Sequence, residues 1–304
     1  MLHSNTPVSI PIPIILDTDI GDDIDDTWAL AMLLKSPELD VRLITTATRD
    51  TTTRARIVAK MLEVAGRTDI PIGIGVPTKP VAMPQADWVA GYDLARYPGT
   101  IHTDGVGALI DTIMNSPQPI TLVCIGPLPN IAAALAREPR IAERARFVGM
   151  HGSVRRGYNG TPPISAEWNV VSFPRECQQV FTAGWDMTIT PVDTCGLVTL
   201  QGEKYRAVRD CPDPVVQALM ENYRAWCAHG DRGDLHRERS SVLFDTVAIY
   251  LAFSEELLSL ETLGIQVTDD GYTLINERAR PVRCATQWKD LPAFEDFLVQ
   301  RLTA

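Results

Sequence analysis

The feature that most constrains this fold is the alternation of short apolar runs with longer segments of helical pattern. Such alternation is typical of chains that layer helices against a largely parallel sheet. We therefore predict an α/β fold, an open and mostly parallel Rossmann-like sheet flanked by helices, in a single domain over residues 1–304. The predicted strands are Ile10–Asp17, Val41–Ala47, Ile70–Gly75, Pro119–Gly126, Ala145–Met150 and Asp186–Asp193.

Helical patterns and two long loops fill the rest of the chain. The first helical segment is apolar almost all round after an acidic first turn, as expected for a helix buried against a sheet. The stretch from Gly75 to His102 is rich in Pro and Gly and too long for a simple connection, so we predict a lid or binding loop there, and a second such loop from His151 to Ala166. The predicted helices are 25–36, 52–66, 214–230, 240–253 and 291–302.

Composition and charge exclude several classes of function. The chain is 45% hydrophobic and 22% charged, as in ordinary globular proteins. A formal net charge of -10, with no local run of Lys or Arg, argues against nucleic-acid binding. The six cysteines are scattered and form no CxxC pair, which indicates reduced thiols. No signal peptide and no apolar stretch of about 20 residues is readable, so no membrane partner is expected and a cytoplasmic location is the expectation.

An acidic cluster follows the first predicted strand, with six aspartates between Asp17 and Asp26. Crowded carboxylates repel one another, which raises their pKa values and resists folding. Asp25 and Asp26 open a helix, whose dipole stabilises each carboxylate by at most about 1 kcal/mol. Ca²⁺ accepts about six to eight oxygen ligands in irregular geometry, and ligands of open α/β sheets bind beyond the carboxyl ends of strands. The cluster predicts a metal site, with a solvated acidic turn as the other interpretation.

Two other metal motifs can be compared with this segment. An EF-hand loop requires Gly at its sixth position and Glu at its twelfth, whereas counting from Asp17 places Gly21 fifth and Trp28 twelfth. The EF-hand interpretation therefore fails. A phosphatase with a DxD motif, with Asp17 as nucleophile and Mg²⁺ as cofactor, remains an alternative.

A second polar motif, SAEWNV, places Glu167 and Asn169 two residues apart. A carboxylate and an amide at this spacing suit a pair of neighbouring hydroxyl groups, one accepting and the other donating a hydrogen bond. A surface loop with scattered polar residues fits the motif equally well. GPLPNIAAAL, which begins at Gly126, predicts a strand end followed by a helix at the same sheet edge.

Together these stretches resemble the family of inosine-uridine preferring nucleoside hydrolases, Ca²⁺-dependent enzymes that cleave the N-glycosidic bond of ribonucleosides. The family's DxDxG segment, followed by DD and an apolar helix, is similar to DTDIGDDIDDTWAL, with Asp22 and Asp23 as two extra residues. ITT, GPLPNIA, AEWN and LFDTVAIY match further family segments in consistent order. The resemblance runs from Ile14 to about Tyr250 and implies an α/β fold, ribonucleoside hydrolysis and a homodimer or homotetramer.

The resemblance also implies roles for individual residues. The metal ligands would be Asp19, Asp26, Asp245 and the backbone carbonyl of Ile125, and the general base would be Asp25. The residues that bind the substrate would be Asp50, Asn159, Glu167 and Asn169, with Asp50 standing where many members have Asn.

One departure from the family concerns the leaving base. A histidine precedes the late metal-binding aspartate in the best-known branch, whereas this chain has Phe244 there. His102, in IHTDGVG, matches a family loop histidine and is the candidate acid, with a structural role as the alternative. Phe244 also favours a non-catalytic Ca²⁺-dependent ribose or nucleoside binding protein, whereas Asp25 favours an enzyme.

Overall fold

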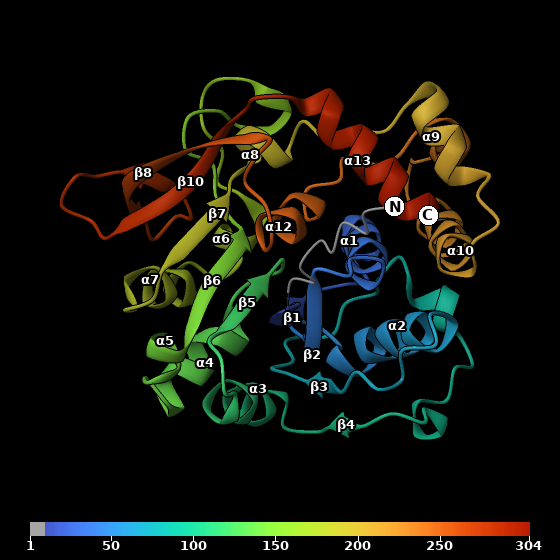
Figure 1. Cartoon of the computed structure of the whole chain (residues 1–304), viewed down its shortest axis with the longest axis horizontal. Helices are drawn as coiled ribbons and strands as arrows, with labels where there is room; N and C mark the ends of the chain where they lie inside the picture. Colours follow the sequence, from blue (N-terminus) through green and yellow to red (C-terminus); the bar gives the residue numbers. More distant parts are fainter. Residues whose placement is uncertain (1–9) are drawn as a thin grey trace, which may run out of the picture.

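A single ten-stranded sheet runs through the computed structural model, which describes residues 10–304 (Figure 1). The strand order is β4-β3-β2-β1-β5-β6-β7-β10-β8-β9. Pairing is parallel from β4 to β10, and β8 and β9 extend the sheet with antiparallel pairing. The strands are β1 Ile12–Thr18, β2 Leu39–Thr46, β3 Ile72–Ile74, β4 Ile101–His102, β5 Ile120–Cys124, β6 Ala145–Met150, β7 Met187–Thr190, β8 Leu258–Val267, β9 Thr273–Ile275 and β10 Pro281–Trp288.

Helices cover both faces of this sheet, so the prediction of an open, mostly parallel α/β sheet is confirmed (Figure 1). The helices are α1 Asp25–Leu34, α2 Thr51–Val64, α3 Gly105–Asn115, α4 Pro129–Arg137, α5 Ile141–Arg144, α6 Trp168–Val171, α7 Pro174–Thr182, α8 Val192–Cys195, α9 Gly202–Arg209, α10 Pro214–Cys227, α11 Leu235–Glu238, α12 Thr246–Leu251 and α13 Leu291–Thr303. Three short 3₁₀ turns are η1 Ala86–Val89, η2 Leu94–Arg96 and η3 Tyr158–Gly160. No helix within residues 10–304 is long and apolar enough to span a bilayer.

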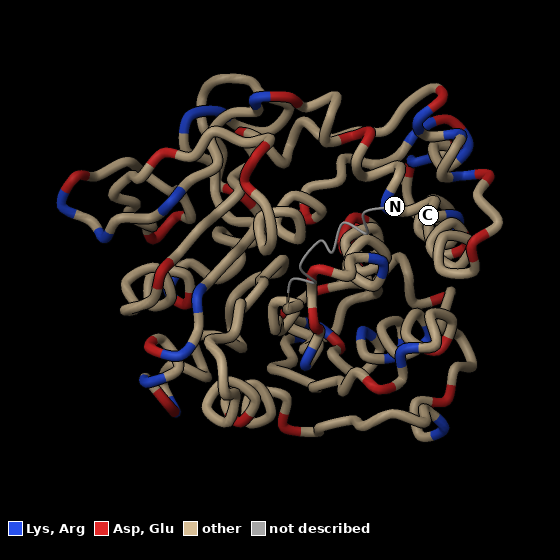
Figure 2. The backbone as a smooth tube through the Cα atoms, in the orientation of Figure 1, with Lys and Arg blue, Asp and Glu red and all other residues tan. Residues whose placement is uncertain are grey.

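Two hydrophobic cores lie on opposite faces of the sheet because strand side chains alternate. In β1, Ile14 and Leu16 join the core under α1, α2, α10, α12 and α13, whereas Ile15 joins the core under α3, α4 and α7. Both faces of the central strands are therefore covered, which explains their continuous apolar runs. Charged residues of both signs are distributed along the whole backbone trace (Figure 2).

Two segments differ from the sequence prediction. The late helix was predicted from Ser240, but α12 begins at Thr246. The backbone before it bonds another segment instead, since Ser240 N–H donates to the Leu200 carbonyl and Leu243 N–H to the Val198 carbonyl. β10 was not predicted at all, yet it connects the parallel part of the sheet to the antiparallel extension.

The strand order changes direction beside β1. The strands β2 to β4 lie on one side of β1, and the next strand in the chain, β5, lies on its other side. β2 pairs with one edge of β1, and β5 pairs with the other edge in parallel. The carboxyl ends of β1 and β5 therefore flank a topological switch point, where open α/β sheets bind ligands. Asp19 follows β1 and Ile125 follows β5, so both predicted metal ligands lie at this point.

Candidate active site

A cavity of about 370 Å³ opens at this switch point. Its lining combines seven carboxylates with two guanidinium groups and an aromatic wall. The carboxylates are Asp19, Asp22, Asp23, Asp25, Asp26, Glu167 and Asp245, the guanidinium groups are Arg49 and Arg232, and the aromatic side chains are Tyr158, Trp168 and Phe244. Ala82 and Pro84, from the predicted binding loop, line it too.

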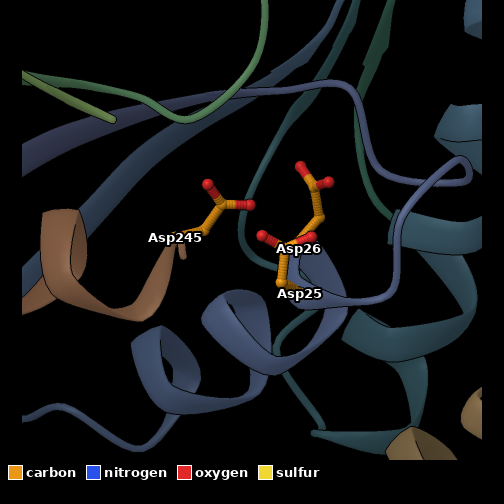
Figure 3. A group of neighbouring side chains, drawn as sticks. All are labelled: Asp25, Asp26 and Asp245. Atoms are coloured by element: carbon orange, nitrogen blue, oxygen red, sulfur yellow. The ribbon is translucent and has the colours of Figure 1, made fainter. Parts of the chain in front are cut away.

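Three of these aspartates form a compact group at the starts of α1 and α12. Asp25, Asp26 and Asp245 each offer a carboxylate oxygen within 4.8 Å of the others, and Figure 3 shows their side chains converging. They are only 5%, 3% and 2% exposed, respectively. Thr18 Oγ1 donates a hydrogen bond to Asp26 Oδ1, which fixes one carboxylate of the group. The sequence separates Asp245 from the other two by more than 200 residues, and the fold brings them together.

The electrostatics of this triad favour a bound cation. Burial raises the pKa of Asp25, Asp26 and Asp245 well above the ordinary range, and the negative charges of neighbouring aspartates raise it further. Anionic carboxylates at this distance are stable only with a compensating positive charge. The donor set consists of hard oxygens, which are the ligands that Ca²⁺ prefers. The residues present therefore fit a hard divalent cation.

Asp19 lies against the chain that follows β5. Burial raises its pKa to about 6, although the positive charge of Arg54 opposes this shift. A Cβ on Gly126 would come within 2.6 Å of Asp19 Oδ1, so only glycine permits this close approach. The neighbouring Ile125 also lines the cavity.

Glu167 and Asn169 are held in the cavity wall by hydrogen bonds. Glu167 is the N-cap of α6, and its carboxylate accepts hydrogen bonds from the backbone N–H groups of Gly152, Asn169 and Val170. Burial nevertheless raises its pKa to about 7. The Asn169 amide nitrogen donates to the carbonyls of Ile125 and Met150, both at 3.0 Å. We expected the Asn169 amide to donate a hydrogen bond to a substrate hydroxyl group. In the structure its nitrogen is already bonded to these two carbonyls, and its side-chain oxygen is left to accept a hydrogen bond.

The extra residues Asp22 and Asp23 have distinct surroundings. Asp22 forms ion pairs with Arg49 at 2.6 Å and with the fully buried Arg54 at 2.8 Å. Arg49 reaches the cavity from a tight turn in which it has a φ of 49°. The Asp23 carbonyl accepts from the Gln85 side chain, which ties the predicted binding loop to the acidic segment.

Three predicted site residues lie away from the cavity lining. Asp50 is the N-cap of α2, and its carboxylate accepts from the N–H groups of Thr52 and Thr53. Asn159 is exposed on η3 with a φ of 60°. His102 lies on β4, beyond β3 and β2 in the sheet, and lines a separate cavity with Asp104 and other residues.

Arg49 and Arg232 were not predicted as site residues from the sequence. Each comes from a loop that approaches the cavity only in the folded chain. Arg49 lies in the short connection 47–50 between β2 and α2, which gave no local signal, and the loop that carries Arg232 is a surface connection of the kind that often carries binding residues.

The chain that forms this cavity is similar to a known protein family. Residues 14–296 match the family model described as inosine-uridine preferring nucleoside hydrolase. The chain belongs to this family. Nucleoside hydrolases are glycosidases that act on N-glycosyl compounds, so this chain is an N-glycosyl hydrolase, as the sequence resemblance predicted.

Curated relatives support the same assignment. The pyrimidine-specific ribonucleoside hydrolase RihA of Salmonella arizonae is 34% identical over 69% of this chain and 70% of its own length. The non-specific ribonucleoside hydrolase RihC of Escherichia coli is 31% identical over 70% of this chain and 73% of its own. The probable uridine nucleosidase 2 of Arabidopsis thaliana is 27% identical over 92% of this chain and 90% of its own.

Solved structures share the fold of this nucleoside hydrolase. A plant nucleoside hydrolase, the PpNRh1 enzyme, superposes with a TM-score of 0.81 at 25% identity, covering 97% of this chain and 100% of that one. A purine-preferring ribonucleoside hydrolase from Gardnerella vaginalis superposes with a TM-score of 0.76 at 21% identity, covering 96% and 98%. The latter likeness concerns the fold alone.

Proposed function

We propose that this nucleoside hydrolase cleaves the N-glycosidic bond of ribonucleosides in a Ca²⁺-dependent reaction that yields ribose and the free base. The observation that carries this proposal is the buried triad of Asp25, Asp26 and Asp245 beside Glu167 and Asn169 in one cavity. Buried carboxylates so close together are anionic only beside a compensating positive charge, and an adjacent carboxylate and amide suit a sugar with neighbouring hydroxyl groups.

The cation would be held by Asp19, Asp26, Asp245 and the carbonyl of Ile125. When bound, Ca²⁺ supplies a positive charge that orients water and hydroxyl oxygens and lowers the pKa of the neighbouring carboxylates. Asp25 then accepts a proton from the water that attacks C1′. It can do so because a carboxylate beside the bound cation is in its anionic form. Glu167 accepts a hydrogen bond from a ribose hydroxyl, and the oxygen of Asn169 accepts from another.

The substrate's hydroxyl groups make the proposal specific for ribose. A 2′-deoxyribose lacks one oxygen, which leaves a buried polar partner unsatisfied. We expect 2′-deoxynucleosides to be hydrolysed at least about 100-fold more slowly than ribonucleosides. Equal rates for the two sugars would contradict this description of the site.

The phosphatase alternative is not supported by the geometry. It required Asp17 as a nucleophile, but Asp17 is 0% exposed and does not line the cavity. Its Oδ1 accepts hydrogen bonds from Thr45 Oγ1 at 2.5 Å and Asn130 Nδ2 at 2.7 Å. Asp17 therefore links β1 to β2 and α4 and cannot reach a substrate.

The decisive experiment measures ribose release from a panel of purine and pyrimidine ribonucleosides, with Ca²⁺ and with chelator. We expect release by the wild type with Ca²⁺, and none with chelator or with Asp25→Asn. Calcium binding without ribose release from any nucleoside would favour the non-catalytic binding protein, which Phe244 suggested.

A comparison of two variants separates the base from the ligands. Asp25 and Asp19 both line the cavity, so Asp25→Asn and Asp19→Asn should be studied by calcium titration calorimetry as well as by turnover. The general base is identified by an amide variant that still binds calcium with the wild-type affinity but no longer turns over the substrate. If Asp19→Asn shows that behaviour and Asp25→Asn loses calcium, the two roles must be exchanged.

His102 and the remaining predicted contacts stay outside this core proposal. Asp50 and Asn159 remain predicted substrate contacts that require movement of their loops, and His102 remains a predicted acid on the same condition. The homodimeric or homotetrameric assembly and the cytoplasmic location also remain predictions from the sequence.

A further inference from the structure

Departure of the base requires a group that stabilises its developing negative charge. Among the residues described, no histidine lines the cavity, and Phe244 occupies the position directly before Asp245. The positively charged side chains in the lining are Arg49 and Arg232. Arg49 donates to Asp22 at 2.6 Å, so its charge is already compensated.

Arg232 has a different environment, on the loop between α10 and α11. Its guanidinium stacks on the ring of Trp226, 3.9 Å from the centroid. Nη1 donates to the His229 carbonyl at 2.5 Å. Across residues 10–304, no carboxylate lies within ion-pair distance of Arg232, and its Nε and Nη2 have no hydrogen-bond partner.

The loop that carries Arg232 is anchored to the acidic segment. Trp226 Nε1 donates to the Asp22 carbonyl at 2.8 Å, which fixes the ring on which the guanidinium rests. The stack and the bond to His229 hold the guanidinium plane, and its remaining N–H edge is free on the lining of the cavity. A planar donor held in this way is suited to oxygen and nitrogen acceptors on a planar ligand.

The position of this edge agrees with where the base must lie. The triad, Glu167 and Asn169 are the groups proposed to hold the sugar, whereas Arg232 stacks on Trp226, whose Nε1 donates to the Asp22 carbonyl. The adjacent Asp23 carbonyl accepts from the side chain of Gln85 in the predicted binding loop. A base attached at C1′ extends away from the hydroxyl groups of the sugar. It therefore extends toward the loop-lined part of the cavity.

We propose that Arg232 is the residue that stabilises the departing base, by hydrogen bonding to it as an anion. The C1′–N bond breaks with both electrons moving to the base nitrogen, while the attacking water forms the new C1′–O bond and gives its proton to the carboxylate base. A guanidinium does not release its proton, so the anionic base takes a proton from solvent afterwards. This inference rests on the proposed ribonucleoside hydrolysis.

The test compares two kinds of leaving group in the calcium-loaded enzyme. Nucleosides have a poor leaving group, whereas p-nitrophenyl riboside has a leaving group that needs no stabilisation. For Arg232→Met, we expect kcat to fall about 100- to 1,000-fold for nucleosides, the loss typical of removing one charge-stabilising donor. For p-nitrophenyl riboside, we expect a loss of less than about fivefold, because binding and water attack are unchanged.

Three further variants make the test selective. Arg232→Lys should recover part of the nucleoside rate, because it restores the charge without the planar donor edge. Arg237→Met, on the exposed face of α11, is the matched control and should leave both substrates unaffected. Tyr158→Phe removes the hydroxyl group of a cavity tyrosine whose ring packs edge-on against Phe244, and only Arg232→Met should show the selective loss.

The possible results distinguish this inference from the proposed function. Equal losses for both substrates in Arg232→Met, no loss, or a selective loss in Tyr158→Phe instead, would each overturn the role of Arg232. A wild type that hydrolyses neither substrate would overturn the proposed hydrolysis itself. Calcium affinity measured by calorimetry, equal in wild type and Arg232→Met, establishes that the variant is folded with its acidic site intact.

Discussion

Replacing Arg54 by methionine should destabilise the protein because this guanidinium is buried and all three of its nitrogens donate hydrogen bonds. Arg54 is 0% exposed on α2. Nε donates to the Thr48 carbonyl at 3.0 Å, Nη1 to the Ile20 carbonyl at 2.8 Å, and Nη2 to Asp22 Oδ2 at 2.8 Å and Thr48 Oγ1 at 3.1 Å. The side chain thus joins the acidic loop after β1 to the turn after β2.

The magnitude follows from what the substitution leaves behind. Methionine fills much of the space, so the main cost is two unsatisfied carbonyls and a carboxylate that loses one of its two ion pairs. Breaking a buried ion pair by removing one partner costs about 3–5 kcal/mol. The Asp22 side chain is 16% exposed and keeps its pair with Arg49, so we expect the lower end, about 3 kcal/mol.

Urea denaturation of the wild type and the variant, both with calcium in excess, measures this difference. Arg56→Met is the matched control on the same helix, because the Nε of Arg56 has no hydrogen-bond partner; its effect should stay within about 0.5 kcal/mol. Adding Asp22→Leu to Arg54→Met should recover part of the loss, because it removes a carboxylate that has lost its buried partner and keeps only the more exposed Arg49. A loss below about 1 kcal/mol in Arg54→Met would refute this account of the buried pair.

Two further predictions concern the residues around Asp19 and Asp17. Gly126→Ala places a Cβ 2.6 Å from Asp19 Oδ1 and should lower calcium affinity by about tenfold or more in calorimetry, whereas Gly184→Ala, whose added Cβ meets nothing within 4 Å, should not change it. Unchanged affinity in Gly126→Ala would show that Asp19 is not required in its present position. Burial raises the pKa of Asp17 from 3.8 to about 7, so its contribution to stability is present below about pH 4 and is lost as the pH rises through about 7. In chelator, Asp17→Asn should therefore be more stable than wild type at pH 8, by up to about 4 kcal/mol, and the difference should shrink toward pH 5. A difference between the two proteins that is constant from pH 5 to pH 8 would contradict the raised pKa.

Local patterns gave a large part of the fold in advance. The apolar runs of β1, β2, β5 and β6 are buried on both faces, so their composition alone distinguishes them from the surrounding helices. The pattern failed for β10 because its run contains Arg283 and Gln287, and its place in the sheet depends on β7 and β8. It also failed before α12, where Val242, Leu243 and Phe244 continue the apolar run of the helix but the backbone bonds to the segment 198–200.

The acidic site shows the same division between local and distant information. The sequence alone predicted a metal site, with a solvated acidic turn as the other interpretation, because six aspartates within ten residues repel one another. It also placed that cluster at a strand end, since the residues of one strand and the helix after it are adjacent in the chain.

Only the tertiary structure decided which distant groups complete the site. Asp245 joins Asp25 and Asp26 because α12 packs against α1, a contact that no local pattern encodes. His102 lies apart because β4 is separated from β1 by two strands. Arg232 lies on the cavity because Trp226 is bonded to the acidic loop. The positions of these three side chains depend on packing between segments far apart in the chain. The physical reason is that many contacts together set which side chains lie close in a fold, and no single stretch of residues contains them all.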